Sequence, residues 1–229
     1  TGSKIEPITI KRYKSEYNSD IACSPISSAT AVRGRIFDND RESVNKTMPG
    51  NAINLFYGTG GLPPNKLDNF STMFHYILKT KQAKYFSEIL DISEGLENRI
   101  IKAAETNFLI SSILKNIKTK RYTYTKLQRA ILHIILGIEK GSFNRLEIDG
   151  SVPYIRVLGF RKNSAPLLTK LTNKAGAPVI TNLKNAKTSL TKNSYNALKK
   201  EMEATDLYYL ALNKPYAKNI EYHVPLVII

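Results

Sequence analysis

Hydrophobic residues recur at helical spacing through the middle of the chain. From Asn69 onward one helical face carries Phe70, Met73, Phe74, Ile77 and Leu78. A stronger pattern predicts a helix over residues 125–137, with Gly137 at its end. Its apolar positions are Leu127, Ile131, Leu132, Ile134 and Ile135. Similar spacing predicts helices over residues 93–104, 106–116 and 192–212, so this part of the chain is expected to be largely helical.

The periodicity changes after Gly141. Residues 153–160 and 177–181 have the apolar runs of buried strands, and residues 164–173 form a predicted helix with Pro166 in its first turn. A strand, a helix and a strand at this spacing predict a small parallel βαβ unit. The chain ends on an apolar tail, residues 227–229.

The first part of the chain has weaker patterns. Residues 6–12 alternate between apolar and polar side chains and predict a strand. A helix is expected to begin in residues 26–33, with Ser27 or Ser28 as its N-cap, and to end by residues 38–40. The stretch from Pro49 to Pro64 is rich in glycine and proline, which predicts a loop and a domain boundary.

The chain is strongly basic, with a formal net charge of +15 and a sequence pI near 9.7. Such a charge indicates a polyanionic partner, with RNA or DNA first, although a merely soluble basic protein is the alternative. No Asp or Glu occurs from Ser151 to Lys200, and we call this range the acid-free segment. Its cations are Arg156, Arg161, Lys162, Lys170, Lys174, Lys184, Lys187, Lys192, Lys199 and Lys200.

A second group of cations, interleaved with tyrosines, occupies residues 115–129, which we call the basic turn. Its candidate RNA-binding residues are Lys115, Lys118, Lys120, Arg121, Tyr122, Tyr124, Lys126 and Arg129. The cations would bind phosphates and the tyrosine rings would stack on unpaired bases. The alternative is a solvated helix start whose tyrosines pack on the core. Arg156, Arg161 and Lys162 complete the predicted RNA-binding set.

A candidate phosphate site lies at the start of the helix predicted in residues 26–33. The first N–H groups of a helix are unpaired and carry partial positive charge, so they attract phosphate oxygens. Ser27, Ser28, Thr30 and Arg33 are placed to complete such a site. The alternative is an ordinary capped helix with a solvated arginine.

The sequence gives little support for a disulfide, a membrane span, a metal site, a phosphate loop or a catalytic set. The single cysteine, Cys23, permits no internal disulfide and fits a reducing cytoplasm, and neither a signal peptide nor a membrane span is expected. The three histidines lack partners at metal-ligand spacing, so no metal site is predicted. Gly58 to Gly61 lacks the ending of a phosphate loop and is interpreted as a linker. No catalytic set of nucleophile, base and orienting group is found.

Three stretches together resemble one family: ISSATAVR (residues 26–33), EGLENRI (94–100) and KTKRYTYTKLQRAILHIILGI (118–138). The chain is similar to the C-terminal part of the bacterial tRNA(Met) cytidine acetate ligases, members of the nucleotidyltransferase superfamily. The resemblance implies that acetate is activated with ATP, accompanied by Mg²⁺, to acetyl-adenylate. The acetyl group then passes to N4 of the wobble cytidine of elongator tRNA(Met). It also implies that Arg33 contacts ATP.

The sequence departs from this family because the Asn-Pro-Phe-His-x-Gly-His nucleotide-binding signature and most of the dinucleotide-fold core are absent. The chain alone is therefore expected not to make acetyl-adenylate. The predicted fold is α+β and predominantly helical. A remnant of the Rossmann-like nucleotidyltransferase core (residues 1–45) would precede a helical and αβ tRNA-binding domain (46–229). Two alternatives remain: a stand-alone RNA-binding module, and a nucleotidyltransferase that acts on a small molecule. The sequence does not predict an oligomeric state.

Overall fold

The computed structural model describes residues 6–11, 27–57, 64–93, 95–148, 152–213 and 218–229. Arg12, Cys23, Ile26 and the predicted linker at Gly58 to Gly61 lie outside these ranges. The chain divides into two compact units, residues 1–64 and 65–229. This division falls at the end of the stretch rich in glycine and proline.

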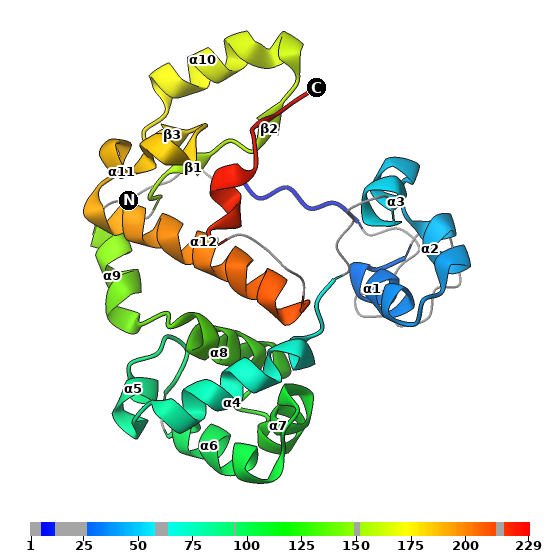
Figure 1. Ribbon diagram of the computed structural model, residues 1–229, viewed down its shortest axis with the longest axis vertical. Coiled ribbons are helices and arrows are strands. Elements are labelled where there is room, and N and C mark those ends of the chain that lie inside the picture. Colours follow the sequence, from blue (N-terminus) through cyan, green and yellow to red (C-terminus); the bar gives the residue numbers. More distant parts are fainter. Residues whose placement is uncertain (1–5, 12–26, 58–63, 94, 149–151, 214–217) are drawn as a thin grey trace. The chain divides into compact units, whose positions relative to one another are not determined.

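The described residues of the first unit form three short helices (Figure 1): α1 (Ala29–Phe37), α2 (Arg41–Thr47) and α3 (Gly50–Tyr57). Helix α1 ends where the sequence predicts, because Asp38 is its C-cap and Asn39 has a left-handed φ of 58°. Asp40 then caps α2, since its carboxylate accepts a hydrogen bond from the Ser43 N–H at 3.1 Å. Hydrogen bonding with the Ser43 side chain, followed by this backbone hydrogen bond, lowers the pKa of Asp40.

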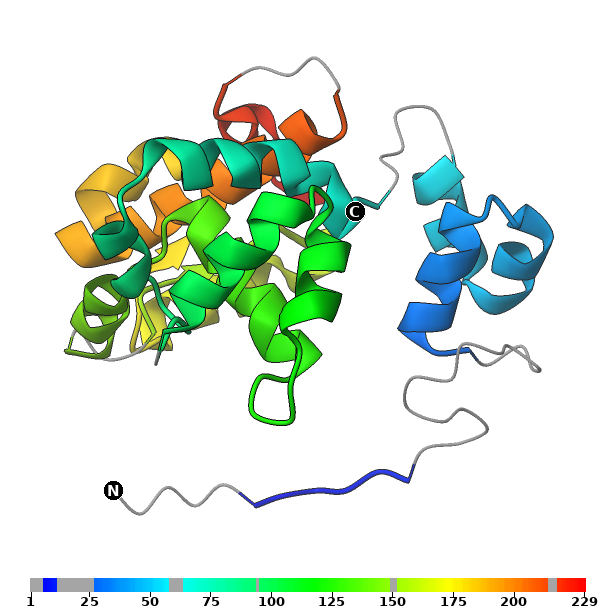
Figure 2. The ribbon, with the colours of Figure 1, turned by 90° about the horizontal axis from the view of Figure 1, so that it is seen from below.

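Two predictions for this unit are wrong. Residues 6–11 form no strand (Figure 2), and Ile8 and Ile10 are 85% and 89% exposed. Alternation alone does not hold a strand without a neighbouring strand to accept its hydrogen bonds. The expected loop after Pro49 instead contains α3, because a proline just before a helix costs little and its carbonyl accepts from the Ile53 N–H.

The first half of the second unit is a helical bundle. Its elements are η1 (Leu67–Phe70), α4 (Ser71–Thr80), α5 (Ala83–Ser87), α6 (Leu96–Thr106), α7 (Ile110–Ile117), α8 (Tyr124–Leu136) and α9 (Lys140–Ile148). The apolar face predicted from Asn69 onward lies in α4, where Phe74 is fully buried against the larger core of the molecule. Leu127, Ile131 and Ile134 of α8 are buried in the same core. The sequence missed the short helix α5 and also α9, which begins just after the Gly137 C-cap of α8.

The second half of this unit is a small αβ layer. It consists of β1 (Ile155–Arg156), β2 (Gly159–Phe160), η2 (Lys162–Ser164), α10 (Ala165–Lys174), β3 (Val179–Ile180), η3 (Leu183–Asn185), α11 (Ala186–Ser189), α12 (Lys192–Ala211), η4 (Ile220–His223) and β4 (Val227–Ile228). Strands β1 and β3 pair in parallel with α10 between them, which confirms the predicted βαβ unit. The fold is thus predominantly helical with short parallel strands, as the sequence predicts.

The apolar tail has a structural role that the sequence did not reveal. It forms β4, which pairs in parallel with β2, so that Gly159 lies opposite Val227. A Cβ atom on Gly159 would come within 2.7 Å of the Val227 carbonyl oxygen, so this close pairing requires a glycine. The predicted strand over residues 153–160 is therefore divided between two different two-stranded sheets.

Candidate nucleotide and RNA interfaces

The four predicted phosphate-binding residues lie together at the first turn of α1. Ser28 is the N-cap, and its Oγ accepts a hydrogen bond from the Ala31 N–H at 3.1 Å. Ser27 is half-buried, whereas Thr30 and Arg33 are exposed. No ion pair joins Arg33 to any residue that the structure describes. This helix start can therefore present a hydroxyl, first-turn N–H groups and a guanidinium to an anionic oxygen.

The basic turn joins α7 to α8 and is closed by threonine hydrogen bonds. The Tyr122 N–H donates to Thr119 Oγ1 at 3.1 Å, and the Thr119 N–H donates to the Tyr122 carbonyl at 3.2 Å. Thr123 caps α8 by accepting from the Lys126 N–H. Lys115, Lys118, Lys120 and Arg121 are exposed, and Lys126 is half-buried. The turn therefore presents several cations to solvent from a well-defined backbone.

The structure places Tyr122 differently from the sequence interpretation. Its side chain is 3% exposed and belongs to the larger core, so its ring is not available to stack on a base. Arg99, Arg121 and Lys126 lie over the ring, with 5.8, 5.9 and 5.6 Å to its centroid. Tyr124 is half-buried and packs on the same core. This part of the structure favours the alternative in which the tyrosines belong to the core, with Tyr122 holding cations around its ring.

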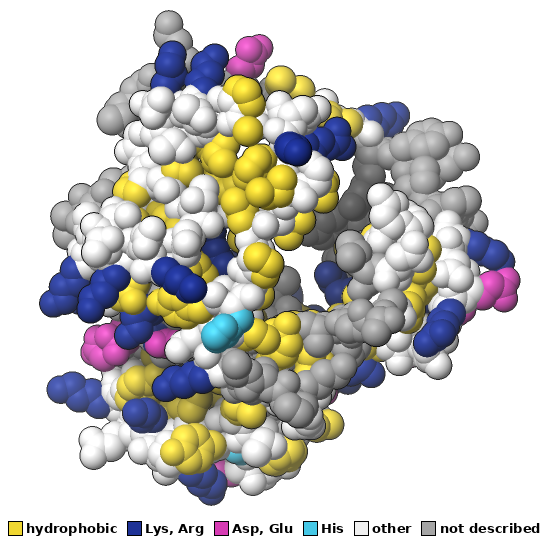
Figure 3. Space-filling model, turned by 45° about the horizontal axis from the view of Figure 1, so that its top comes forward, with side chains coloured by type: hydrophobic (Ala, Val, Ile, Leu, Met, Phe, Trp, Pro, Cys, Tyr) yellow, Lys and Arg dark blue, Asp and Glu magenta, His cyan; other side chains and the backbone are white. Residues whose placement is uncertain are grey.

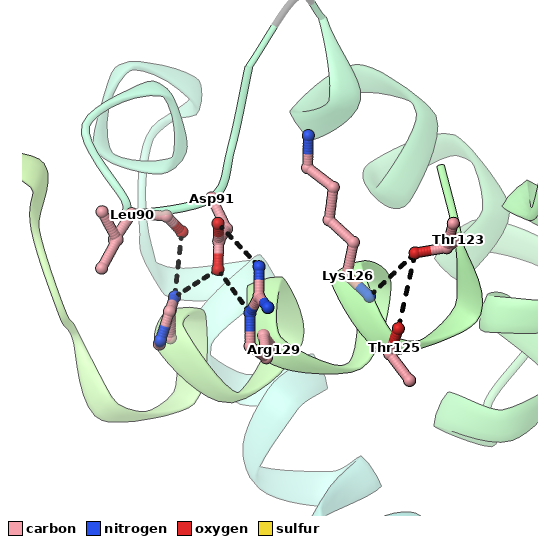
Figure 4. Close-up of polar contacts among 7 residues, drawn as sticks. Leu90, Asp91, Thr123, Thr125, Lys126 and Arg129 are labelled. Carbon is pink, nitrogen blue, oxygen red and sulfur yellow. Dashed lines mark hydrogen bonds and ion pairs between the residues drawn. The ribbon is translucent and has the colours of Figure 1, made fainter. Parts of the chain in front are cut away.

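Arg129 is held by an acid from a distant part of the chain. Its Nε and Nη2 donate to the two Asp91 carboxylate oxygens at 3.0 and 3.3 Å (Figure 4). The same carboxylate lies 3.4 Å from His133 Nδ1, which is also 3.2 Å from the Leu90 carbonyl oxygen. The hydrogen bond with Asp91 raises the pKa of Arg129 above its usual value. The positive charge of Arg129 is therefore compensated within the fold.

Asp91 is a residue that the sequence analysis missed. It has a left-handed φ of 64° and follows the short helix α5, and 38 residues separate it from Arg129. No spacing pattern in the sequence links Asp91 to Arg129, because the two residues meet only where α8 packs against the loop that follows α5. Among the described residues, no group of three His, Cys, Asp or Glu side chains is placed to hold a metal ion.

Arg156 is likewise used by the fold. Its Nη1 lies 2.5 Å from Glu221 Oε2 and 3.5 Å from Glu201 Oε2, and the Arg156 side chain is only 21% exposed. Glu221 also accepts a hydrogen bond from Thr205. Burial, followed by hydrogen bonding with Glu201, raises the pKa of the neighbouring Tyr154. Arg156 therefore ties β1 to α12 and η4.

Most other cations of the acid-free segment remain exposed. Lys200 pairs with Glu203 at 2.7 Å. Within the described ranges, no ion pair involves Arg161, Lys162, Lys170, Lys174, Lys184, Lys187, Lys192 or Lys199. Figure 3 shows a face on which Lys and Arg side chains are spread over several elements while Asp and Glu side chains are few. Such a surface attracts phosphates.

Comparison with known proteins gives a consistent set of similarities. A family model described as HIGH Nucleotidyl Transferase matches residues 1–222. The tRNA(Met) cytidine acetate ligase of Thermoanaerobacter sp. (strain X514) is 32% identical over 228 residues, covering 99% of this chain and 55% of that protein. The ligase of Acetivibrio thermocellus is 29% identical over 219 residues, covering 93% of this chain and 53% of that protein. The chain thus spans about half the length of these curated relatives.

Solved structures resemble the whole chain in fold. The apo form I crystal structure of Thermotoga maritima TmcAL matches with a TM-score of 0.87 at 23% identity, covering 100% of this chain and 56% of that one. The form II crystal structure of the same protein, bound with alpha-thio ATP, matches with a TM-score of 0.80 at 22% identity and covers 89% of this chain and 52% of that one. Among the described helices, none combines the length and the apolar character that crossing a bilayer requires.

Proposed function

This chain belongs to the HIGH nucleotidyltransferase family, and from that premise we propose that it forms part of a tRNA(Met) cytidine acetate ligase. In the proposed reaction, an acetate oxygen attacks the α-phosphorus of ATP and pyrophosphate leaves, which gives acetyl-adenylate. The N4 amine of the wobble cytidine in elongator tRNA(Met) then attacks the acetyl carbonyl carbon. AMP leaves, and the amine loses one proton. The reaction takes place in the cytoplasm, where tRNA is found.

In this proposal the first unit contributes one edge of the ATP site. Arg33 and the first turn of α1, with Ser27, Ser28 and Thr30, bind phosphate oxygens. Mg²⁺ accompanies ATP and neutralises part of its charge. The support is the combination of an exposed guanidinium and a capped helix start on a chain that belongs to the HIGH nucleotidyltransferase family. We assign no catalytic residue to this chain.

The second unit contributes the tRNA-binding surface. The observation that carries this assignment is the set of exposed cations between Arg161 and Lys199, which form no ion pair with any described residue. Cations that are not neutralised within the fold release counterions from RNA when they contact its phosphates. The exposed cations of the basic turn, Lys115, Lys118, Lys120 and Arg121, add to this surface.

The double variant Lys120→Ala plus Arg121→Ala tests the contribution of the basic turn to this surface. We expect it to weaken binding of elongator tRNA(Met) and to reduce the slope of log affinity against log salt by up to about 1 for each phosphate that the variant no longer binds. The measurement is fluorescence anisotropy of labelled tRNA with the 229-residue chain over a series of salt concentrations.

The matched control also removes two positive charges, but from the part of the bundle near the C-terminal end of α8. Tyr85 of α5 lies close to Gly137 at the C-terminal end of that helix. A 13-residue helix is about 20 Å long, so α5 is far from the basic turn. Lys84 lies in α5 and Lys79 lies in the last turn of α4, just before it. Lys79→Ala plus Lys84→Ala should therefore retain more of the affinity and the slope. Equal losses in the two double variants would show that only net charge matters and would overturn the placement of RNA at the basic turn.

A further inference from the structure

A cavity of about 660 Å³ lies at the carboxyl ends of β1 and β3. Val157 and Leu158 follow β1 directly, Thr181 and Asn182 follow β3, and all four line the cavity. In parallel α/β sheets, ligands bind outside the carboxyl ends of the strands. The volume falls within the range of about 300–1,000 Å³ that is usual for small-ligand pockets.

Helix η4 forms another wall of the cavity, and hydrogen bonds within the fold hold it in place. The Asp206 carboxylate accepts hydrogen bonds from the Asn219 and Ile220 N–H groups at 2.8 and 3.2 Å. Glu221 pairs with Arg156 at the end of β1. A pocket held in this way requires little ordering when a ligand binds, and this favours affinity.

The lining combines apolar walls with a few polar groups, as in most sites that bind small ligands. Ile180, Leu183 and Leu226 supply apolar surface. Asn182 Oδ1 accepts from the Lys184 N–H at 2.9 Å, which orients the amide. Within the described parts of the chain, the Asn182 NH₂ group and the His223 imidazole have no hydrogen-bond partner. Both are therefore available to a ligand.

The charge around the cavity favours a ligand attached to phosphates. Lys184 lines it and is exposed, and no described acid pairs with it. Glu221, the carboxylate in the lining, is already paired with Arg156. An anionic ligand would therefore meet an uncompensated cation and little repulsion.

We propose that this cavity binds one unstacked nucleoside of the bound tRNA, an inference that rests on the proposed function. The base enters between the apolar walls, the Asn182 amide and His223 hydrogen-bond its edge, and Lys184 contacts an adjacent phosphate. Unstacked bases read along their edges by side chains are the usual targets of sequence-specific RNA recognition. The chemistry recognised is a nucleobase with a neighbouring phosphate, which a free nucleotide also offers.

The test uses Asn182→Ser, which keeps an oxygen to cap Lys184 but removes the NH₂ donor. We expect affinity for elongator tRNA(Met) to fall about 10-fold, as for removal of a base-edge hydrogen bond. The salt slope should be unchanged, because the cations that bind phosphates are all retained. Lys184→Ala should instead reduce that slope by up to about 1. Asn185→Ser makes the same chemical change on η3 outside the cavity and should bind as the unmodified chain does.

The outcomes separate the two proposals. If the unmodified chain binds tRNA with a steep salt dependence and Asn182→Ser binds equally well, the cavity proposal is wrong and the proposed function stands. If the unmodified chain shows no salt-sensitive tRNA binding, the proposed function itself fails. Cytidine 5′-monophosphate is titrated into the same proteins. Saturable binding that Asn182→Ser abolishes, with tRNA affinity unaffected, would assign the cavity to free nucleotides and overturn the RNA proposal.

Thr181→Phe provides a second variant that does not depend on the Asn182 cap. Thr181 is exposed and lines the cavity, so the larger ring occupies the space for a base without disturbing the core. We expect a loss of tRNA affinity at least as large as that of Asn182→Ser, with an unchanged melting temperature. Unchanged affinity in a folded Thr181→Phe protein would contradict the proposal.

Discussion

The basic turn and the acid-free segment are both rich in cations, but the fold uses the two regions differently. In the basic turn, Tyr122 is buried in the core with cations over its ring, and Arg129 is bound to Asp91. In the acid-free segment, Arg156 is bound to acids, whereas Arg161 and the lysines from Lys162 to Lys199 are exposed without a described acid partner. The acid-free segment therefore has the more available charge.

Counting charges along the sequence does not show which cations form ion pairs in the folded chain. Asp91 lies 38 residues before Arg129. Arg156 forms ion pairs with Glu201 and Glu221, both of which come after the end of the acid-free segment. Ion pairing depends on which elements pack together, so an arginine in a stretch without acids can still be neutralised. Only the folded chain distinguishes a structural cation from one that is available to RNA.

The largest effect is expected at Tyr122. Tyr122→Ala leaves a cavity in the larger core and should lower the free energy of unfolding by about 3–5 kcal/mol, as for other large aromatic truncations. Tyr122→Leu keeps most of the apolar volume and should lose less stability. Urea denaturation of the two variants measures both effects.

The same variants distinguish a core residue from a stacking residue. If Tyr122 serves the core, folded Tyr122→Leu protein should bind tRNA as the unmodified chain does. A large loss of tRNA affinity, with little change in the unfolding transition, would mean that RNA reaches the ring. The basic turn would then resemble the sequence interpretation more than the structure does.

A smaller effect on stability is expected where an arginine of the acid-free segment is paired. Arg156→Met leaves Glu221, whose side chain is 13% exposed, without its cation. Breaking such a pair should lower the free energy of unfolding by about 3 kcal/mol. Arg161→Met, at an exposed position without a described partner, should change stability by less than about 0.5 kcal/mol.

For RNA binding, Arg161→Met is the variant that should have the larger effect. Arg161→Met should reduce the salt slope of tRNA binding by up to about 1, while folded Arg156→Met protein should leave it unchanged. Denaturation and anisotropy titrations on the same preparations provide both readouts. If Arg156→Met flattened the salt dependence and Arg161→Met did not, the distinction between structural and available cations would be wrong.

Much of the second unit could be predicted because its signals are local. Helix α8 carries its own apolar face, its Thr123 cap and its Gly137 end, with a left-handed φ of 61°. The parallel pairing of β1 with β3 follows from the spacing of two apolar runs around a helix. In these places, short-range preferences and the tertiary structure agree.

The remaining features depend on contacts that are distant in sequence. Residues 6–11 have the alternation of a strand but form none in the structure. The tail becomes β4 only because Gly159 permits close approach to Val227. For the candidate site, the exposed lysines followed from composition, whereas the burial of Tyr122 and the pairing of Arg129 did not. Both depend on how the helices of the bundle pack.

The smallest effect is expected from releasing Arg129. Asp91→Asn keeps a side chain that tolerates the left-handed φ of 64° but removes the paired charge. Because Arg129 is 61% exposed and its charge is screened by solvent, the pair should contribute little to stability. The freed guanidinium should steepen the salt slope of tRNA binding by up to about 1 and increase affinity at low salt. Glu88→Gln removes an exposed acid nearby that forms no ion pair with any described residue, so it provides the matched control. Equal gains in the two variants would assign the effect to net charge, whereas a gain confined to Asp91→Asn would show that pairing with Asp91 is what keeps Arg129 from RNA.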